Sequence, residues 1–222
     1  MATVSYTPLA ASTMLEYAAR WYAWGEPMAT AIDDSLLRHF HALEARLENE
    51  PDGVSGEIAV GVYMMSPRPR PKHGGVQVKL SSALHQRFGR GQGGEPPEWF
   101  FAIEPEIRSE RALSRLVPDV AGWRRTGAGW PDMGVTPVTL MPDWVAEVLS
   151  PGTEPTDRGV KTEAHGAMGV GWLWLVDAER QRVETFANQR GRMVAGPVFG
   201  LGESIAGEPF GAESVPVADI LA

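Results

Sequence analysis

The sequence predicts an α/β fold with a central mixed β-sheet flanked by helices, plus an N-terminal helical extension. Apolar residues recur with helical spacing in two segments of the first half. Short apolar segments of strand length, bounded by turn residues, dominate the second half. These elements follow the order helix, three strands, helix, strand, which differs from the repeating strand–helix units of a purely parallel sheet. With 222 residues, the chain is long enough for one domain with a complete core.

Two segments have the periodicity of amphipathic helices. The first covers residues 33–49, where Asp33 or Asp34 can cap the helix N-terminus. The second covers residues 74–88. The apolar residues that define the two helical faces are Leu36, Phe40, Leu43 and Leu47 in the first, and Val76, Val78, Leu80, Leu84 and Phe88 in the second.

The strand-like segments surround one further predicted helix, which spans about residues 157–168. Proline, glycine and aspartate residues at their ends mark the turns. The expected strands are Gly56–Met65, Trp99–Ile107, Leu116–Trp123, Trp144–Leu149, Trp172–Asp177 and Arg182–Phe186.

The chain is expected to divide into three parts. Residues 1–53 form the N-terminal helical extension, and residues 54–195 form the main domain. Residues 196–222 are acidic and rich in glycine and proline, which predicts an irregular C-terminal wrap. The extension contains an aromatic cluster, for which docking on the core or on a second subunit is expected rather than a ligand cage: Tyr17, Trp21, Tyr22 and Trp24.

The composition excludes several classes of protein. There is no cysteine, which excludes disulfides, thiolate catalysis and cysteine-ligated zinc. No membrane span and no signal peptide is indicated, so a cytoplasmic protein without membrane partners is expected. The net charge of -8 argues against a protein that coats nucleic acid non-specifically. Residues 68–125 nevertheless contain eleven lysines and arginines against six acids, which permits a basic face beside an acidic site.

Two acids are embedded in apolar segments of strand length. Asp119 lies within Leu116–Ala121, and Glu147 lies within Trp144–Leu149. An ionised carboxylate in such a setting needs a partner or a metal, because its desolvation is costly. If the two segments pair side by side, both carboxylates can bind one cation at roughly 2.0 to 2.6 Å.

Lys161 completes the candidate site. With Thr156 or Asp157 as the helix N-cap, Lys161 lies about one turn into the helix that follows the strand of Glu147. A long side chain at that position can reach back over the end of the strand. Two carboxylates and a lysine are the minimum set for divalent-metal phosphodiester chemistry, but Lys161 can also simply neutralise two buried acids.

Several motifs in the sequence together resemble the Uma-type restriction-endonuclease family, part of the PD-(D/E)xK phosphodiesterase superfamily. The resemblance covers roughly residues 54 to 186. Its main motifs are Pro118-Asp119, Glu147-Val148-Leu149-Ser150-Pro151, Asp157-Arg158-Gly159-Val160-Lys161 and the segment Met168–Asp177, joined upstream by Gly56-Glu57, Ser66-Pro67, His73 and Glu104.

The resemblance implies a restriction-endonuclease-like core that binds Mg²⁺ or Mn²⁺. Asp119 and Glu147 match the metal-binding acids, the main-chain carbonyl of Val148 is a further ligand, and Lys161 matches the lysine that orients or activates the attacking water. In the commoner superfamily pattern this lysine stands two residues after the acid, where this chain has Leu149. The matching positions whose role the resemblance does not assign are Glu57, His73 and Glu104.

Two functions follow as expectations. The first is a hydrolase, a metal-dependent endonuclease that cleaves the phosphodiester bonds of DNA with a metal-activated water. The second is an inactive nucleic-acid-binding or protein-interaction module on the same fold. A homodimer is also expected, because double-strand cleavage calls for two sites and the aromatic cluster at Tyr17 to Trp24 offers apolar surface to bury.

Overall fold

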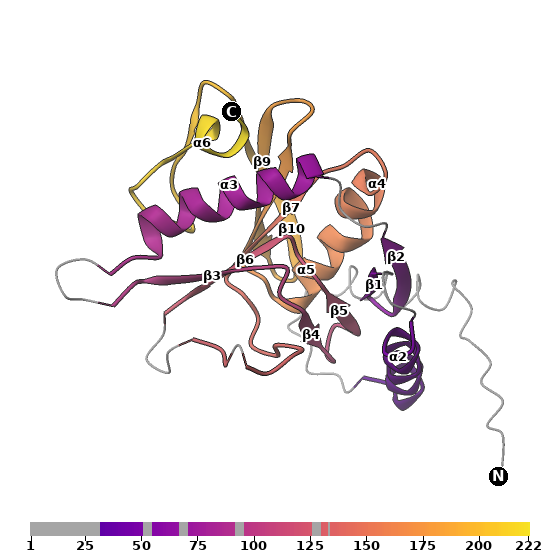
Figure 1. Ribbon diagram of the computed structural model, residues 1–222. Coiled ribbons are helices and arrows are strands. Elements are labelled where there is room, and N and C mark those ends of the chain that lie inside the picture. Colours follow the sequence, from indigo (N-terminus) through magenta and orange to yellow (C-terminus); the bar gives the residue numbers. More distant parts are fainter. Residues whose placement is uncertain (1–31, 51–54, 67–70, 92–95, 126–129, 133) are drawn as a thin grey trace, which may run out of the picture.

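A six-stranded mixed β-sheet lies at the centre of the computed structural model, which describes residues 32–50, 55–66, 71–91, 96–125, 130–132 and 134–222 (Figure 1). Its strand order is β10-β9-β8-β7-β6-β3. Only β7 and β8 run parallel, and the other neighbours are antiparallel. The strands are β3 (Trp99–Ile103), β6 (Val120–Arg124), β7 (Trp144–Val148), β8 (Trp172–Asp177), β9 (Arg182–Gln189) and β10 (Arg192–Gly200).

A second, four-stranded sheet has the order β2-β1-β5-β4. With the helix α2 (Asp34–Leu47), it forms one side of the molecule (Figure 1). Asp33 caps α2 by accepting a hydrogen bond from the backbone N–H of Ser35, so the predicted cap and helix are confirmed. The strands are β1 (Ser55–Ala59), β2 (Val62–Ser66), β4 (Ile107–Ser109) and β5 (Ser114–Leu116).

Helices cover both faces of the central sheet. The helix α3 (Pro71–Phe88) crosses one face, with the short α6 (Val217–Leu221) beside it (Figure 1). A helical segment that ends in α5 (Thr162–Met168) packs on the other face. Successive residues of a strand point to opposite faces. The side chains that pack with α3 are therefore Trp144, Ala146, Val148, Trp174 and Val176, and those that pack with α5 are Val145, Leu173 and Leu175.

Three segments predicted as single strands are each divided in the structure. Gly56–Met65 is the hairpin β1–β2, which turns at Val60 and Gly61 with positive φ at both residues. Trp99–Ile107 ends its first strand at Ile103, and Glu104 then turns the chain with a φ of 50° toward β4. The first prediction was wrong because the apolar pattern continues through a turn, Val60 and Gly61, whose residues are still buried. In the second segment the chain turns at the exposed Glu104, which is followed by Pro105, a residue that cannot donate a strand hydrogen bond.

The third divided segment is Leu116–Trp123, and its division matters for the site. β5 ends at Leu116 in the four-stranded sheet, and β6 begins at Val120 in the central sheet. Between them lies Pro118, which has no backbone N–H to donate to a strand neighbour. Asp119 therefore lies where the chain passes from one sheet to the other.

The C-terminal part is more regular than predicted. β10 continues to Gly200 across the expected boundary at residue 196, with a bulge between Ala195 and Val198. After it, β11 (Ser204–Ile205) pairs with β12 (Val215–Pro216), and α6 ends the chain. The aromatic cluster of Tyr17 to Trp24 lies outside the described residues.

Candidate active site

Asp119 and Glu147 lie side by side at one edge of the central sheet. In the antiparallel pair β6–β7, Val120 is opposite Ala146. Asp119 directly precedes the first of these residues, and Glu147 directly follows the second. Asp119 Oδ2 also accepts a hydrogen bond of 2.6 Å from the backbone N–H of Val148. The side chain of Glu147 is only 3% exposed, whereas that of Asp119 is 13% exposed.

Lys161 reaches the same point from a kinked helical segment. After β7 the chain forms α4 (Glu154–Thr156) and then the segment η1 (Asp157–Lys161), which runs directly into α5. The backbone of Gly159 departs from helical geometry within η1, so the helical segment is kinked at this glycine. The predicted helix is confirmed, but Asp157 lies inside the helical segment and does not cap its start.

Three carboxylates surround the ammonium group of Lys161. Lys161 Nζ lies 3.0 Å from Glu147 Oε1, 3.3 Å from Glu57 Oε1 and 3.9 Å from Asp157 Oδ1. Its side chain is only 6% exposed. Burial alone would lower the pKa of Lys161, but Glu147 and Glu57 outweigh burial and raise it above its ordinary value. Lys161 is therefore protonated throughout the neutral range.

Glu57 contacts both Lys161 and the chain segment that connects the two sheets. It lies on β1, is 3% exposed, and accepts a hydrogen bond of 2.7 Å from the backbone N–H of Val117. The same oxygen, Oε1, faces Lys161 Nζ. Glu57, a residue of the four-stranded sheet, is therefore held in contact with Lys161 of the helical segment.

Asp119 is held by two residues of α3. His73 Nε2 and Gln77 Nε2 each lie 2.8 Å from Asp119 Oδ1. The Gln77 amide also donates to Glu104 Oε1 at 3.1 Å, so Glu104 is connected to Asp119 through Gln77. Gln77 was missed in the sequence, although it stands four residues after His73 on the same helix face.

His165 is a second residue that the sequence reasoning missed. It lies on α5, is fully buried, and places Nε2 2.9 Å from Glu147 Oε1. Asp157, Lys161 and His165 are spaced by four residues, the period that brings helix side chains onto one face. This spacing was the available signal for both His165 and Asp157.

The site contains more buried negative charge than its lysine can neutralise. Burial raises the pKa of Glu57 and of Asp119 above their ordinary values. Burial, and then the charge of Glu147, raises the pKa of Asp157 to about 7. Burial would also raise the pKa of Glu147, but Lys161 and His165 together hold it below its ordinary range. Four acids around one lysine are thus an electrostatic setting that favours a cation.

The donor atoms fit a hard divalent cation held partly by water. Among the described residues, no group of three or more histidine, aspartate and glutamate side chains has the geometry of a complete metal site. Protein donors engage Glu147 Oε1 and both carboxylate oxygens of Asp119. Mg²⁺ commonly keeps several waters and binds only one or two carboxylates, so two acids and the Val148 carbonyl meet its requirement.

The fold of this chain is shared with a protein of known structure. The chain is similar to a solved structure described as "a putative nuclease" from Anabaena variabilis, with a TM-score of 0.62 and 20% sequence identity. The match covers 81% of this chain and 96% of the other. The two proteins therefore share a mixed α/β fold with a large central sheet flanked by helices, which confirms the predicted fold class.

The chain belongs to the Uma2 family, described as "Putative restriction endonuclease". The family profile matches residues 37–218 and so confirms the resemblance seen in the motifs. No curated protein sequence matches the chain. Within the described residues, no helix has both the length and the apolar character needed to cross a membrane.

Proposed function

We propose that this protein is a metal-dependent endonuclease that hydrolyses phosphodiester bonds of DNA. The observation that carries the proposal is the convergence of Asp119, Glu147 and Lys161 at one edge of the central sheet. Membership in a restriction-endonuclease family supports a nuclease, and restriction endonucleases act on DNA.

Each of these residues has a distinct task in the proposed reaction. Asp119, Glu147 and the main-chain carbonyl of Val148 would hold Mg²⁺ or Mn²⁺. When bound, such a cation neutralises phosphate charge and lowers the pKa of a coordinated water. His73 and Gln77 keep Asp119 in place, because both donate to Oδ1. The other oxygen, Oδ2, accepts a hydrogen bond from the backbone N–H of Val148 on β7.

Lys161 is suited to orient the attacking water or to stabilise the charge that develops on the phosphate. An ammonium group has three N–H donors. The ion pairs with Glu147 and Glu57 account for two of them. Asp157 Oδ1, at 3.9 Å, is beyond hydrogen-bond distance, so the third N–H can donate to a water or a phosphate oxygen. A fixed donor of this kind lowers the barrier through preorganised electrostatics.

A second function, an inactive binding module on the same fold, is favoured by one specific observation. The side chain of Lys161 is 6% exposed and is surrounded by acids, as expected of a residue that only balances buried charge. A lysine with that role would be needed for folding but not for chemistry.

The variant Lys161→Met separates the two functions. The nuclease proposal predicts that cleavage falls by about a hundredfold or more, the scale of losing one preorganised group. It also predicts that the fold and Mn²⁺ affinity are largely retained. Cleavage of plasmid and single-stranded DNA should be measured with Mg²⁺ and Mn²⁺, beside thermal melts. Lys79→Met is the matched control, since Lys79 is exposed and lies outside the candidate site, with its hydrogen bond to the main-chain oxygen of Ala222.

The opposite result would favour the binding module. In that case the unchanged protein cleaves neither substrate with either metal. Lys161→Met would then lower the free energy of unfolding by about 3 to 5 kcal/mol, because it leaves buried acids uncompensated. Added metal would restore much of that stability.

A further inference from the structure

His165 has surroundings that the proposed roles of the carboxylates and the lysine do not explain. It stands one helical turn after Lys161 and is fully buried. Nε2 lies 2.9 Å from Glu147 Oε1. Nδ1 is buried as well, and it has no hydrogen-bond partner within the described part of the chain.

These unequal surroundings determine which ring nitrogen carries a proton. A carboxylate oxygen only accepts hydrogen bonds, so Nε2 must donate to Glu147 Oε1. A proton on Nδ1 would be a buried donor without an acceptor, which is costly. His165 therefore carries its proton on Nε2 and leaves Nδ1 without one.

The hydrogen bond from His165 makes the two oxygens of Glu147 unequal. Oε1 faces two donors from the same helix face, His165 Nε2 at 2.9 Å and Lys161 Nζ at 3.0 Å. Oε2 accepts no hydrogen bond from any described residue, so its lone pairs are available to a ligand. Hydrogen bonds to one oxygen of a metal-binding carboxylate commonly set the orientation of the other.

Lys161 alone is poorly suited to fix this orientation. Its ammonium group lies on a flexible stem and is drawn toward Glu57 and Asp157 as well as Glu147. The imidazole of His165 is a rigid ring enclosed by the packing of α5 on the sheet. The direction of the Glu147 carboxylate is therefore set by the ring and not by the lysine.

We infer that His165 is a positioning residue that fixes Glu147 through Oε1 and so keeps Oε2 available to a divalent cation. The inference deepens the proposed function and rests on it, because it requires a cation at Asp119 and Glu147. His165 itself is not a ligand, since Nε2 is used by Glu147 and Nδ1 is buried away from any described polar group.

Two variants of His165 distinguish the effect of its hydrogen-bond donor from the effect of its ring volume. His165→Phe keeps an aromatic ring and removes the donor, whereas His165→Gln places an N–H near the position of Nε2. Calorimetry with Mn²⁺ should show about 10- to 100-fold weaker binding for His165→Phe, the usual cost of losing an outer hydrogen bond to a metal ligand. His165→Gln should stay within about threefold of the unchanged protein, because it restores that hydrogen bond.

A matched control is available on α2. His39 is also buried, and its Nε2 lies 3.0 Å from the Gly61 carbonyl oxygen, away from the carboxylates. His39→Phe and His165→Phe should both lower the melting temperature, because each removes a buried hydrogen bond. Unlike His165→Phe, His39→Phe should leave the affinity for Mn²⁺ unchanged.

The tautomer of His165 provides a test that does not depend on any variant folding. Long-range ¹H–¹⁵N spectra of the unchanged, metal-free protein distinguish the Nε2–H form from the Nδ1–H form. The chain has only five histidines, so comparison with His165→Gln assigns the signal. The expected form is Nε2–H.

The outcomes separate this inference from the proposed function. An Nδ1–H tautomer, unchanged Mn²⁺ affinity in His165→Phe, or equal weakening in the Phe and Gln variants would overturn the role of His165 and leave the nuclease proposal standing. Failure of the unchanged protein to bind Mn²⁺ would contradict the proposed function itself and, with it, the cation that His165 is inferred to serve.

Discussion

At the scale of single residues, Asp157 connects the charge of the site to the stability of the fold. Its pKa rises from an ordinary 3.8 to about 7, because the side chain is buried and lies near Glu147. The folded protein therefore binds this proton more tightly than the unfolded chain does between those two values. The contribution of Asp157 to the free energy of unfolding therefore falls as pH rises from about 4 to 7, by at most about 1.4 kcal/mol per pH unit for one proton. Glu147, whose pKa is lowered, acts in the opposite direction at the acid end of this range.

The variant Asp157→Asn should reduce that slope, since asparagine does not titrate. The measurement is urea unfolding of the metal-free protein at several pH values between 5 and 8. His73, Glu57 and Asp119 also have raised pKa values and act in the same direction, so part of the slope should remain. Equal slopes for the variant and the unchanged protein would show that Asp157 is ionised at lower pH than the geometry implies.

The sequence indicated the central residues of the candidate site and, without a role, the supporting residues Glu57 and His73. It missed Gln77 and His165. Asp119 and Glu147 stand out because each is a single acid in an apolar strand segment, and Lys161 because it follows at helical distance. Gln77 and His165 are not unusual in their own segments. Their importance comes from contacts with Asp119 and Glu147 across the fold, which no local pattern encodes.

At the scale of elements, the position of α5 depends on a close approach at Gly166. A Cβ atom there would lie 2.7 Å from the Gly191 carbonyl oxygen and 3.2 Å from the Met193 nitrogen, both backbone atoms of the neighbouring hairpin. Gly166→Ala should therefore force α5 away from β10 and lower the free energy of unfolding by about 1 to 3 kcal/mol.

Gly75 provides the control for this prediction. It lies in α3, is exposed, and has no atom within 4 Å of an added Cβ. Gly75→Ala should stabilise the protein by about 0.5 to 1 kcal/mol, because alanine favours the helix. Chemical denaturation of both variants tests the pair, and a destabilisation of similar size at the two positions would contradict the packing argument.

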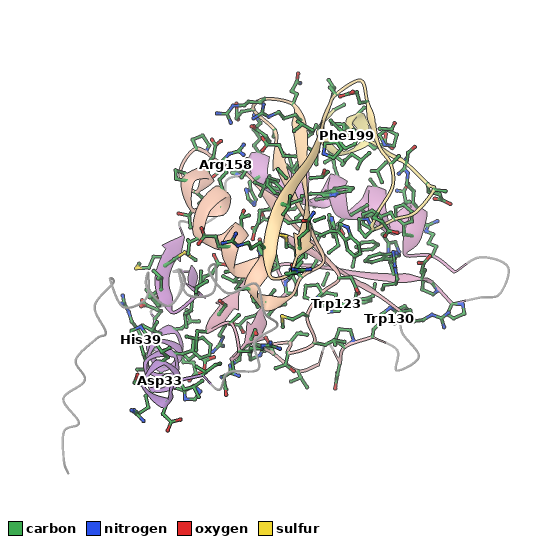
Figure 2. All side chains as sticks on the ribbon, turned by 180° about the vertical axis from the view of Figure 1, so that it is seen from behind. Asp33, His39, Trp123, Trp130, Arg158 and Phe199 are labelled. Carbon is green, nitrogen blue, oxygen red and sulfur yellow. The ribbon has the colours of Figure 1, made fainter. Side chains whose placement is uncertain are left out.

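The helical segment that carries Lys161 is also fixed by Arg158 (Figure 2). The Arg158 guanidinium donates two hydrogen bonds to Glu184 on β9, at 2.7 and 2.9 Å, and a third to Glu154. A paired, planar contact of this kind restricts orientation as well as distance. Arg158 thus anchors η1 to the sheet between Asp157 and Lys161.

Arg158→Met should lower DNA cleavage by about tenfold or more, because small displacements of a catalytic group are costly. Arg87→Met is the control, since Arg87 forms an ion pair of 2.6 Å with Asp219 of α6, outside the candidate site. Cleavage rates and melting temperatures of both variants should be compared. Equal losses of activity would show that general stability, not the position of Lys161, is responsible.

The element pattern could be predicted only in part, for a physical reason. Segments such as Trp144–Val148 and Trp172–Asp177 were placed correctly because they are buried on both faces and bounded by turn residues. The sequence predicts a single strand from Leu116 to Trp123, because its apolar character does not stop where the chain changes sheets. The direction of the chain at Pro118 is set by tertiary packing.

At the scale of the whole molecule, a homodimer remains a prediction. Cleavage of both strands of a duplex calls for two sites, and a symmetric pair of subunits supplies them. Sedimentation at micromolar concentration should give about twice the chain mass of 24.1 kDa. A monomer would instead be consistent with nicking, with a single-stranded substrate or with the inactive module.

The central claim is that the buried carboxylates at the edge of the sheet bind a divalent cation. The most direct test is a crystal soaked with Mn²⁺, with anomalous scattering used to locate the ion. We expect a peak between Asp119 and Glu147 and within bonding distance of the Val148 carbonyl, at roughly 2.0 to 2.6 Å from its oxygen ligands. A well-diffracting, Mn²⁺-saturated crystal with no peak there, or with Mn²⁺ bound only elsewhere, would contradict it.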